Sequence, residues 1–455
     1  MWENSQKFSI KSILIVPSCE ACHWQLGTTM TSTERTTGTA WEAFADVDLD
    51  AEYEHALKAP DPAVSDPHPV YDELRAECAV YRGDVLQDIF KLPYSMANRG
   101  GGDRKVFTFL THEACTTAYR HPEVFSSTIL QETIGKVMGN SLITFDPPEH
   151  TRLRKLLLET FNKKQLGHWR DDIVDPVVEH LFARFSGRGS AELMREYALQ
   201  LPIRVIHDII GLAPEQFDEF QRLAVGLQLA KTRPEIGAAA SERLCELLSE
   251  VIEVRRRDPA NTTVDVLLNA RVDGERPLAH EELLAFLRVL LVAGGETTTR
   301  GLGSLLVGLL NDTAQLDRLR EDRGLLAQAI EEAIRWESPT QFNYRITTQD
   351  IEIDGVDIPA GSGINLCIAA ANRDPARHED PHRFDIGRKS RGHLGFGFGA
   401  HACIGMHVAR TEITLAMNAL LDRLPGLRIA AGHPPLKVEG TTFRNPSVIP
   451  VEWDN

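Results

Sequence analysis

Apolar residues recur along the chain at the spacing of amphipathic helices. Between residues 68 and 270 they fall three and four positions apart in several segments, which predicts that this half is mostly helical. Residues 280–311 form the longest helical candidate. Because this segment is apolar nearly all round, we expect it to run through the core. The clearest of the shorter segments are 153–161, 174–185 and 223–229.

A helix start is predicted just after residue 146. Asp146 can cap the helix, the two prolines that follow fit its first turn, and Glu149 suits the positive end of the helix dipole. His150 and Arg154 are four residues apart, so they lie on one face of this helix.

The last third of the chain alternates helices with short strands. A helix is expected over about residues 325–336, because Pro339 disfavours helical geometry just before it. Residues 351–358 predict a short hairpin around an Asp-Gly turn. A turn-rich stretch then leads to a last long helix over about residues 404–424.

Composition indicates a folded protein and argues against nucleic-acid binding. Of 455 residues, 42% are hydrophobic and 25% are charged, as in ordinary globular proteins. The formal net charge of -16 repels phosphate backbones. No apolar run approaches the roughly 18 to 20 residues of a membrane span. Seven scattered cysteines fit a reducing compartment. We therefore expect a soluble cytoplasmic protein.

Residues 1–29 differ from the rest of the chain. Because a polar run that begins with Met30 would make a natural start, we expect residues 1–29 to be a disordered extension or a mis-assigned start. Residues 30–455 are expected to form a single domain. The extension contains a C-x-x-C-H match, the spacing of covalent c-type haem attachment, which we interpret as accidental because attachment requires export. This match consists of Cys19, Cys22 and His23.

A glycine-rich segment carries the strongest chemical signal. It reads FGFGAHACIG over residues 396–405. Glycines allow a tight loop, and Cys403 lies where a helix is expected to begin, so backbone amides and the helix dipole should lower the pKa of its thiol. Such a thiolate is a ready metal ligand, although a lone cysteine beside a turn is more often a buried core residue. No phosphate-binding glycine motif fits the segment.

A second signal lies in the middle of the long apolar helix, where Glu296 and Thr297 follow two glycines. A carboxylate is costly there unless it reaches water or a partner, and a mid-helix threonine tends to donate to the carbonyl four residues earlier, here Ala293. The glycines weaken the helix and permit a local bulge. By itself this pattern also fits a packing contact with a glutamate that reaches solvent.

Two groups of charged residues flank the turn-rich stretch. Glu332 and Arg335 are three residues apart, a spacing that usually marks a solvent-exposed pair. Arg388, Lys389 and Arg391 form a basic cluster in an acidic chain. They are a candidate docking surface for an acidic partner, and a solvated loop is the equal alternative.

Together these features resemble cytochromes P450. The resemblance spans about residues 68–445 and implies a mainly α fold with small β-sheets, a triangular helical prism that encloses non-covalent haem b (iron protoporphyrin IX). Five matched positions at fixed spacing make it highly specific. The glycine-rich segment matches the haem-binding pattern F-x-x-G-x-[HR]-x-C-x-G at Phe396, Gly399, His401, Cys403 and Gly405.

The resemblance assigns the haem-binding residues. Cys403 would be the proximal ligand of the iron, and Phe396 would cover its sulfur. Positions that neutralise the haem propionates are occupied by basic residues, and an arginine fork binds carboxylates well. These residues are His150, Arg154, Arg345 and His401.

It also assigns catalytic and bracing residues. Glu296 and Thr297 match the pattern [AG]-G-x-[DE]-T-[TS], whose acid and alcohol deliver protons during dioxygen activation. Thr297 would hold the oxygen and its water, and Glu296 would connect them to solvent. Glu332 and Arg335 match the E-x-x-R pattern and would brace the proximal core together with Arg373.

The implied activity is that of a haem-thiolate monooxygenase, which inserts one oxygen atom from O2 into a small apolar organic substrate by hydroxylation or a related oxidation. Electrons from NAD(P)H would arrive through a separate ferredoxin and ferredoxin reductase, docking near Arg388, Lys389 and Arg391. Two alternatives are a peroxide-driven haem-thiolate peroxygenase and a non-catalytic haem-binding or gas-sensing protein. Neither would require Glu296 and Thr297.

The substrate is expected to be a terpenoid, steroid, fatty acid or aromatic compound. A polar group on it would meet Gln341 or Asn343. By family position, the residues that line the substrate pocket are Gly294, Gln341, Phe342, Asn343, Thr442 and Phe443.

Overall fold

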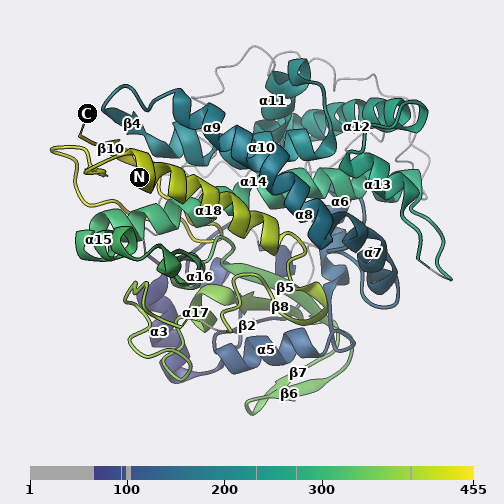
Figure 1. The fold of residues 1–455 in the computed structure, drawn as a ribbon. Coiled ribbons are helices and arrows are strands. Elements are labelled where there is room, and N and C mark those ends of the chain that lie inside the picture. The colour runs from purple at the N-terminus through teal and green to yellow at the C-terminus, as the bar shows by residue number, and fades with distance from the viewer. Residues whose placement is uncertain are drawn as a thin grey trace, which may run out of the picture.

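The computed structural model describes residues 66–93, 95–98, 104–231, 233–272, 274–389 and 392–454. The predicted extension of residues 1–29, with its C-x-x-C-H match, lies outside the described residues, and so does Arg391. Helices make up most of the described chain and three small sheets complete it, which confirms the mainly α class with small β-sheets (Figure 1).

Most of the helices pack in one half of the molecule, and the five-stranded sheet lies in the other (Figure 1). The shorter α-helices are α4 Val85–Asp88, α6 Ile134–Met138 and α17 Ile368–Asn372. The longer ones are α3 His68–Glu77, α5 His112–Arg120, α7 Glu149–Leu158, α8 Lys163–Trp169, α9 Asp175–Ala183, α10 Gln200–Ile210, α11 Phe217–Gln228, α12 Pro234–Arg257, α13 Thr263–Asn269, α14 His280–Asn311, α15 Thr313–Glu321, α16 Leu326–Trp336 and α18 Met406–Arg423.

The helix α14 is the predicted core helix, with the predicted bounds. It is buried on most sides because α10, α12, α16 and α18 pack around it, so its apolar side chains have no solvent-facing stripe. The predicted bulge is absent: α14 continues as an α-helix through Gly294 and Gly295. The helices expected over residues 325–336 and 404–424 are confirmed as α16 and α18.

The sheets connect segments that are far apart in sequence. In the largest sheet the strand order is β1-β2-β8-β5-β3, with β2 and β8 parallel and the other pairs antiparallel. Its strands are β1 Val80–Tyr81, β2 Val106–Phe109, β3 Phe125–Ser126, β5 Phe342–Thr347 and β8 Gly363–Cys367. The second sheet, β4-β10-β9, contains Ser190–Glu192, Pro450–Glu452 and Arg428–Ile429.

The predicted hairpin is confirmed as β6 Ile351–Ile353 and β7 Val356–Ile358. Asp354 and Gly355 between the strands have φ angles of +49° and +72°. Positive φ at both central residues matches the twist of a two-residue hairpin turn, which explains the Asp-Gly sequence.

The helix α7 begins at Glu149, as predicted, but Asp146 does not cap it. Pro148 occupies the N-cap position and offers no side-chain acceptor. The Asp146 carboxylate instead accepts hydrogen bonds from the Ser126 hydroxyl and, at 2.8 Å, from the Ser127 N–H. The carboxylate therefore ties the start of α7 to the turn that follows β3.

Candidate active site

The glycine-rich segment forms a closed loop around Cys403. The Cys403 N–H donates a hydrogen bond to the Phe396 carbonyl at 2.8 Å, which joins the two ends of the loop. Between them, Gly399 has a φ of +69°, and a Cβ there would lie 2.7 Å from the Tyr119 carbonyl oxygen on α5. Glycine is favoured on both grounds. The loop therefore holds Cys403 just before α18, which begins at Met406.

Four basic side chains gather beside this loop. His150 and Arg154 come from α7, Arg345 from β5 and His401 from the loop itself. The ring centroids of His150 and His401 are 4.2 Å apart, and Arg345 is only 5% exposed. Both ring nitrogens of His150 are buried without a hydrogen-bond partner. Across the described ranges, no carboxylate lies within ion-pair distance of Arg154 or Arg345.

Two of the four, Arg154 and Arg345, carry a charge that no carboxylate of the described residues pairs with, although the charge of Asp146 acts on Arg345. Burial lowers the pKa of Arg345 and of His150, and it lowers that of His401 to about 2, with Arg345, His150 and Arg154 acting on His401 in the same direction. Burying positive charges without counterions is unfavourable. A ligand with two carboxylates would supply both the charge and the hydrogen-bond acceptors. Haem carries two propionates, so these residues fit the group that the sequence resemblance implies.

The environment of Cys403 differs from the prediction. Burial raises the pKa of its thiol, whereas the helix start was expected to lower it. The predicted influence is present but weaker than burial. The N–H groups of Gly405 and Met406 and the guanidinium groups of Arg154 and Arg410 favour the thiolate. A bound metal ion would favour it much more strongly.

In the middle of α14, one prediction is confirmed and one stays a prediction. Thr297 Oγ1 donates to the Ala293 carbonyl at 2.7 Å, as expected. Glu296 forms an ion pair with Arg300 at 2.8 Å, with side chains 14% and 7% exposed. Arg300 also lies over the Phe443 ring, 4.7 Å from its centroid. Glu296 is therefore paired within the helix and still partly exposed, and its predicted connection to solvent stays a prediction.

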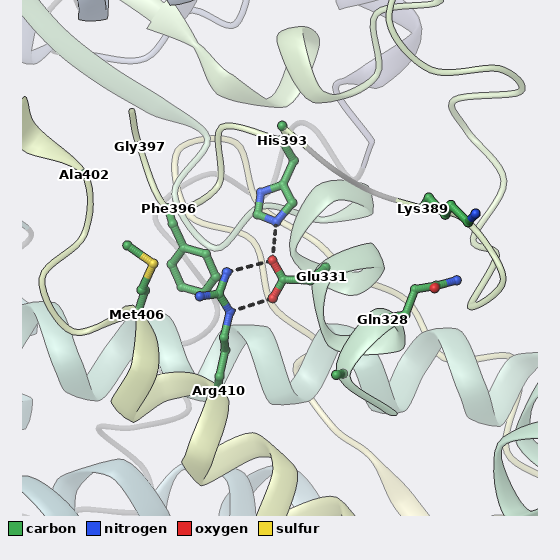
Figure 2. Close-up of a pocket in the computed structure, with 11 residues that line it drawn as sticks. Gln328, Glu331, Lys389, His393, Phe396, Gly397, Ala402, Met406 and Arg410 are labelled. Atoms are coloured by element: carbon green, nitrogen blue, oxygen red, sulfur yellow. Dashed lines mark hydrogen bonds and ion pairs between the residues drawn. The ribbon is translucent and has the colours of Figure 1, made fainter. Parts of the chain in front are cut away.

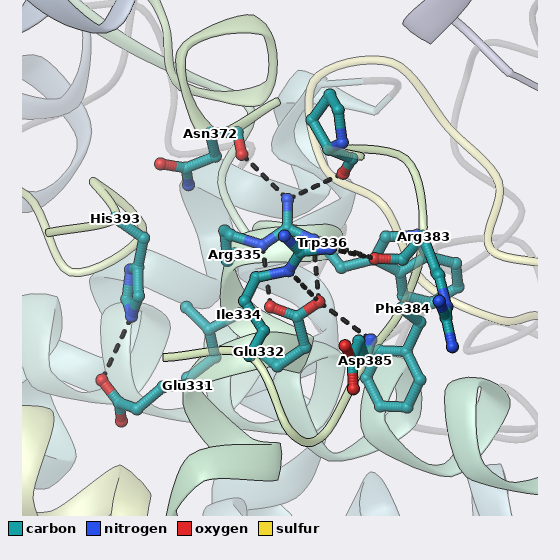
Figure 3. A network of polar contacts seen from close by, with 12 residues as sticks. Glu331, Glu332, Ile334, Arg335, Trp336, Asn372, Arg383, Phe384, Asp385 and His393 are labelled. Atoms are coloured by element: carbon teal, nitrogen blue, oxygen red, sulfur yellow. Dashed lines mark hydrogen bonds and ion pairs between the residues drawn. The ribbon is translucent and has the colours of Figure 1, made fainter. Parts of the chain in front are cut away.

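Glu332 and Arg335 are fully buried and paired through two hydrogen bonds of 2.8 Å (Figure 3). Arg335 also donates to the carbonyls of Asn372, Pro381 and Arg383. Because both carboxylate oxygens and all three guanidinium nitrogens have partners, the pair fastens the turn-rich stretch to α16.

Arg373 and Arg388 have partners that the sequence did not predict. Glu332 accepts a hydrogen bond from Arg388 Nε at 3.0 Å, so the third member of the brace is Arg388. Arg373, predicted for that place, pairs with Glu337 at 2.6 Å. The side chain of Arg388 is 14% exposed and is committed to this brace, and its role in docking stays a prediction. Lys389 is exposed.

Of two predicted pocket residues on β5, Phe342 belongs to the protein core and Asn343 is half-buried. Phe342 is 1% exposed and packs edge-to-face against Tyr71, with ring centroids 6.0 Å apart. The Asn343 amide donates to the Tyr119 hydroxyl. The prediction that Phe342 lines an open pocket is wrong, and Asn343 already uses its donor within the protein.

The remaining pocket candidates lie on three segments. Gly294 on α14 faces α10, where an added Cβ would lie 2.9 Å from Ile206 Cδ1. The Thr442 carbonyl accepts from the Gln341 N–H at 3.1 Å, which joins the segment after α16 to the segment before β10. Gln341 Oε1 is buried without a hydrogen-bond partner, and Phe443 is half-buried beneath Arg300.

Sequence reasoning missed a charged cluster beside the loop (Figure 2). Glu331 on α16 accepts two hydrogen bonds of 2.7 Å from Arg410 on α18, and its other near neighbour is His393 Nε2 at 3.1 Å. Arg410 lies 4.6 Å from the Phe396 ring centroid. Two signals could have found the cluster: one member directly precedes the E-x-x-R pattern, and another follows the cysteine by two helical turns.

A second missed cluster joins α3 to the C-terminal region. Glu337 binds Arg373 at 2.6 Å and Arg444 at 2.7 Å, and His68 Nε2 lies 3.4 Å from its carboxylate. Burial would raise the pKa of Glu337, but the two arginines hold it well below its usual range. Burial and the charge of Arg373 lower the pKa of His68 to about 4.

Comparisons with known proteins agree with this site. The family model of cytochrome P450 matches residues 82–443. The chain is 39% identical over 301 residues to cytochrome P450 107B1 of Saccharopolyspora erythraea, covering 66% of this chain and 74% of that protein. It is 34% identical over 391 residues to the vitamin D(3) 25-hydroxylase of Pseudonocardia autotrophica, covering 85% and 93%.

A solved structure shows the same fold. CYP109E1 from Bacillus megaterium, in complex with testosterone, superposes with a TM-score of 0.75 at 27% identity, covering 86% of this chain and all of that one. A helical fold with a cysteine loop, an unbalanced basic cluster and a buried E-x-x-R pair defines a haem-thiolate oxidoreductase.

The chain belongs to the cytochrome P450 family. It is therefore an oxygen-incorporating oxidoreductase that uses haem b, O2 and electrons from reduced pyridine nucleotide delivered by redox partners. No helix in the described part of the chain is long and apolar enough to cross a membrane.

Proposed function

We propose that this protein inserts one oxygen atom from O2 into a small apolar organic substrate, by hydroxylation or a related oxidation. Electrons come from a separate ferredoxin and its reductase, and residues 30–455 form the single catalytic domain. The observation that carries the proposal is the pair of arginines without a paired carboxylate, Arg154 and Arg345, together with the buried and unpartnered His150 ring beside the loop of Cys403. A protein has no structural reason to keep this cluster unless an anionic group fills it.

In this proposal Cys403 would bind the haem iron through its sulfur, and the bound haem would supply the site of O2 activation. Arg154, Arg345, His150 and His401 bind the propionates through charge-assisted hydrogen bonds. The closed loop presents the sulfur in one orientation, because the Cys403 N–H is fixed to the Phe396 carbonyl.

Proton delivery is assigned to Thr297 and Glu296. Thr297 keeps its hydroxyl in place through the bond to the Ala293 carbonyl, which leaves the oxygen free to accept a hydrogen bond from water. The Glu296 carboxylate is 14% exposed while paired with Arg300, and opening of this pair would free it to exchange protons with water. The proton path is therefore gated by Arg300, which the Phe443 ring holds from its other side.

The substrate class is an apolar molecule of steroid or terpenoid size. Support comes from relatives: one is named a vitamin D(3) 25-hydroxylase and one structure holds testosterone. The residues that would meet the substrate are Gly294, Thr442 and Phe443. Gln341 is 0% exposed, so its unpartnered Oε1 would meet a substrate hydroxyl only after a local movement. Lys389 remains exposed for an acidic partner.

The first test is the carbon monoxide difference spectrum of the reduced holoprotein, wild type against Cys403→His. We expect a strongly red-shifted Soret band in the wild type and its loss in the variant. Cys78→Ser is the matched control, because Cys78 is another free cysteine far from the loop in sequence, and it should keep the band. A haem-loaded wild type without the band would overturn thiolate ligation.

Turnover then separates the alternatives. A steroid library is incubated with ferredoxin, reductase and NAD(P)H, or with peroxide alone. Product only in the first reaction supports the monooxygenase, product only with peroxide supports a peroxygenase, and binding without product in either supports a haem-binding or sensing protein.

A further inference from the structure

Phe396, whose carbonyl closes the Cys403 loop, lies against a charged clamp formed by Arg410, Glu331 and His393 (Figure 2). Arg410 on α18 places its guanidinium 4.6 Å from the Phe396 ring centroid. Glu331 on α16 holds that guanidinium through two hydrogen bonds of 2.7 Å. His393 Nε2 lies 3.1 Å from Glu331 Oε2, the oxygen that also accepts from Arg410 Nη2, and the His393 ring centroid is 5.9 Å from that of Phe396.

The backbone brings these groups together because the loop lies directly against α16. A Cβ on Gly395 would lie 2.5 Å from Ile334 Cγ2 and 3.0 Å from the Ile334 carbonyl oxygen, so only glycine permits this approach. The neighbouring Phe396 carbonyl receives the Cys403 N–H at 2.8 Å. The ring that Arg410 contacts therefore belongs to the residue that also fixes the Cys403 backbone.

The charges of the clamp are firmly held. Although burial favours the neutral acid, hydrogen bonds from His393 and Arg410 hold the pKa of Glu331 at about 2. Through the Phe396 ring, the charge of Arg410 lies against the residue whose carbonyl accepts the Cys403 N–H. A cation on the face of an aromatic ring is attracted by the ring electrons, and this attraction fixes the ring as well as the cation.

We propose that Arg410 is a positioning residue: it holds the Phe396 ring beside Cys403, and its charge helps to set the reduction potential of the iron that Cys403 binds. Glu331 and His393 keep Arg410 in this place. The inference rests on the proposed role of Cys403 as axial ligand. A positive charge near a metal–thiolate site stabilises the reduced form, so its removal lowers the potential.

A purely structural interpretation exists, and the chain itself offers the control. Ion pairs between helices often only join surfaces and contribute little. Arg423, at the other end of α18, makes the same contacts: two hydrogen bonds of 2.7 and 2.8 Å to Glu179, and a position 3.9 Å from the Phe182 ring centroid. That pair lies more than three helical turns along α18 from Arg410.

The experiment measures the midpoint potential of the substrate-free holoenzyme by spectroelectrochemistry. Arg410→Gln should make one-electron reduction about threefold to tenfold less favourable, where tenfold corresponds to about 59 mV. Glu331→Gln removes a negative charge and leaves the cation, so it should shift the potential in the opposite direction. Arg423→Gln and Glu179→Gln should leave the potential unchanged. The red-shifted carbon monoxide band should persist in all four variants.

The outcomes separate the two proposals. If the wild type shows the thiolate band but Arg410→Gln has the potential of Arg423→Gln, the inference is overturned and the proposed function stands. A shift of Glu331→Gln in the same direction as Arg410→Gln also overturns it. If Arg410→Gln does not fold, the midpoint potentials of Glu331→Gln and Glu179→Gln are compared instead, and equal potentials overturn the inference. A wild type without the band overturns both.

Discussion

Two buried charged clusters flank the Cys403 loop, and they differ in completeness. The cluster of Glu332, Arg335 and Arg388 has carboxylate oxygens and guanidinium nitrogens bonded within the protein. In the basic cluster of His150 and its three neighbours, both ring nitrogens of His150 are buried without a hydrogen-bond partner, and Arg154 and Arg345 have no paired carboxylate among the described residues. Both are built from residues that, judged singly, would be assigned to the surface.

This difference in hydrogen bonding distinguishes a cluster that stabilises the fold from a cluster that binds a ligand. A complete network gains nothing from a ligand and loses heavily when one member is removed. An incomplete network lowers the stability of the free protein, and a ligand that supplies the missing hydrogen-bond partners restores that stability. Completeness of hydrogen bonding, rather than burial or charge, therefore indicates which cluster binds haem.

Removal of one member from the complete cluster should have the largest effect. Glu332→Ala leaves Arg335 buried without its carboxylate, so the free energy of unfolding should fall by about 3 to 5 kcal/mol. Chemical denaturation measures it. Glu179→Ala, which breaks the exposed pair with Arg423, is the control and should cost less than about 1 kcal/mol. Equal losses in the two variants would contradict the comparison.

The cluster around Glu337 should respond to pH through His68. Because burial lowers the pKa of His68 from 6.5 to about 4, the unfolded chain binds more protons between these values. Stability is therefore full above about pH 6.5 and is lost as pH falls toward 4, by roughly 2 to 3 kcal/mol. Thermal unfolding of wild type and His68→Gln at pH 7 and 5 tests this: the difference between the two pH values should shrink in the variant. If the stability difference between pH 7 and pH 5 is the same in His68→Gln as in the wild type, another group causes the loss of stability at low pH.

The incomplete cluster should behave in the opposite way. Arg345→Met removes a buried charge that has no counterion in the free protein, so the apo-protein should be at least as stable as the wild type. Haem affinity should fall by about 1.5 to 3 kcal/mol, the value of a hydrogen bond to a charged group. Haem titration and apo-protein unfolding are measured together. A strongly destabilised apo-protein would show that Arg345 serves the fold instead.

The smallest effect is expected at the proton path. Arg300→Gln opens the pair with Glu296, which at low exposure contributes about 1 kcal/mol to stability. If the pair gates proton delivery, the solvent isotope effect on turnover should decrease in the variant, while haem binding stays unchanged. Arg318→Gln, on α15, serves as the control. An isotope effect equal to that of the wild type would remove Arg300 from the path.

Local sequence signals predicted the helices and the hairpin well. The long α14 followed from its continuous apolar pattern, the end of α16 from Pro339, and the turn at Asp354 and Gly355 from its dipeptide. The two glycines of α14 would permit a local bulge, but the helix continues through them. Its close packing against α10 at Gly294 was not visible in the sequence. Packing of this kind depends on a segment almost ninety residues away.

Site residues could be predicted where a family motif fixes their spacing in the sequence. Their hydrogen-bond partners could not, because several residues of the right type were available. Arg373 and Arg388 lie in one turn-rich stretch, and the sequence does not rank them as partners of Glu332. Asp146 was predicted to cap α7 from its position alone. The serines that it binds instead lie about twenty residues earlier, and the sequence does not show that they are its partners. The raised pKa of Cys403 was missed because burial is set by the whole fold.

The parallel pairing of β2 with β8 governs when the site can assemble during synthesis. Residues 106–109 pair with residues 363–366, so the central sheet waits for most of the chain to leave the ribosome. The histidines that meet beside the loop, His150 and His401, are also separated by most of the chain. Such long-range contacts form slowly. During synthesis, helices can therefore form well before the residues beside the Cys403 loop come together. We expect haem to bind late in the folding of the protein.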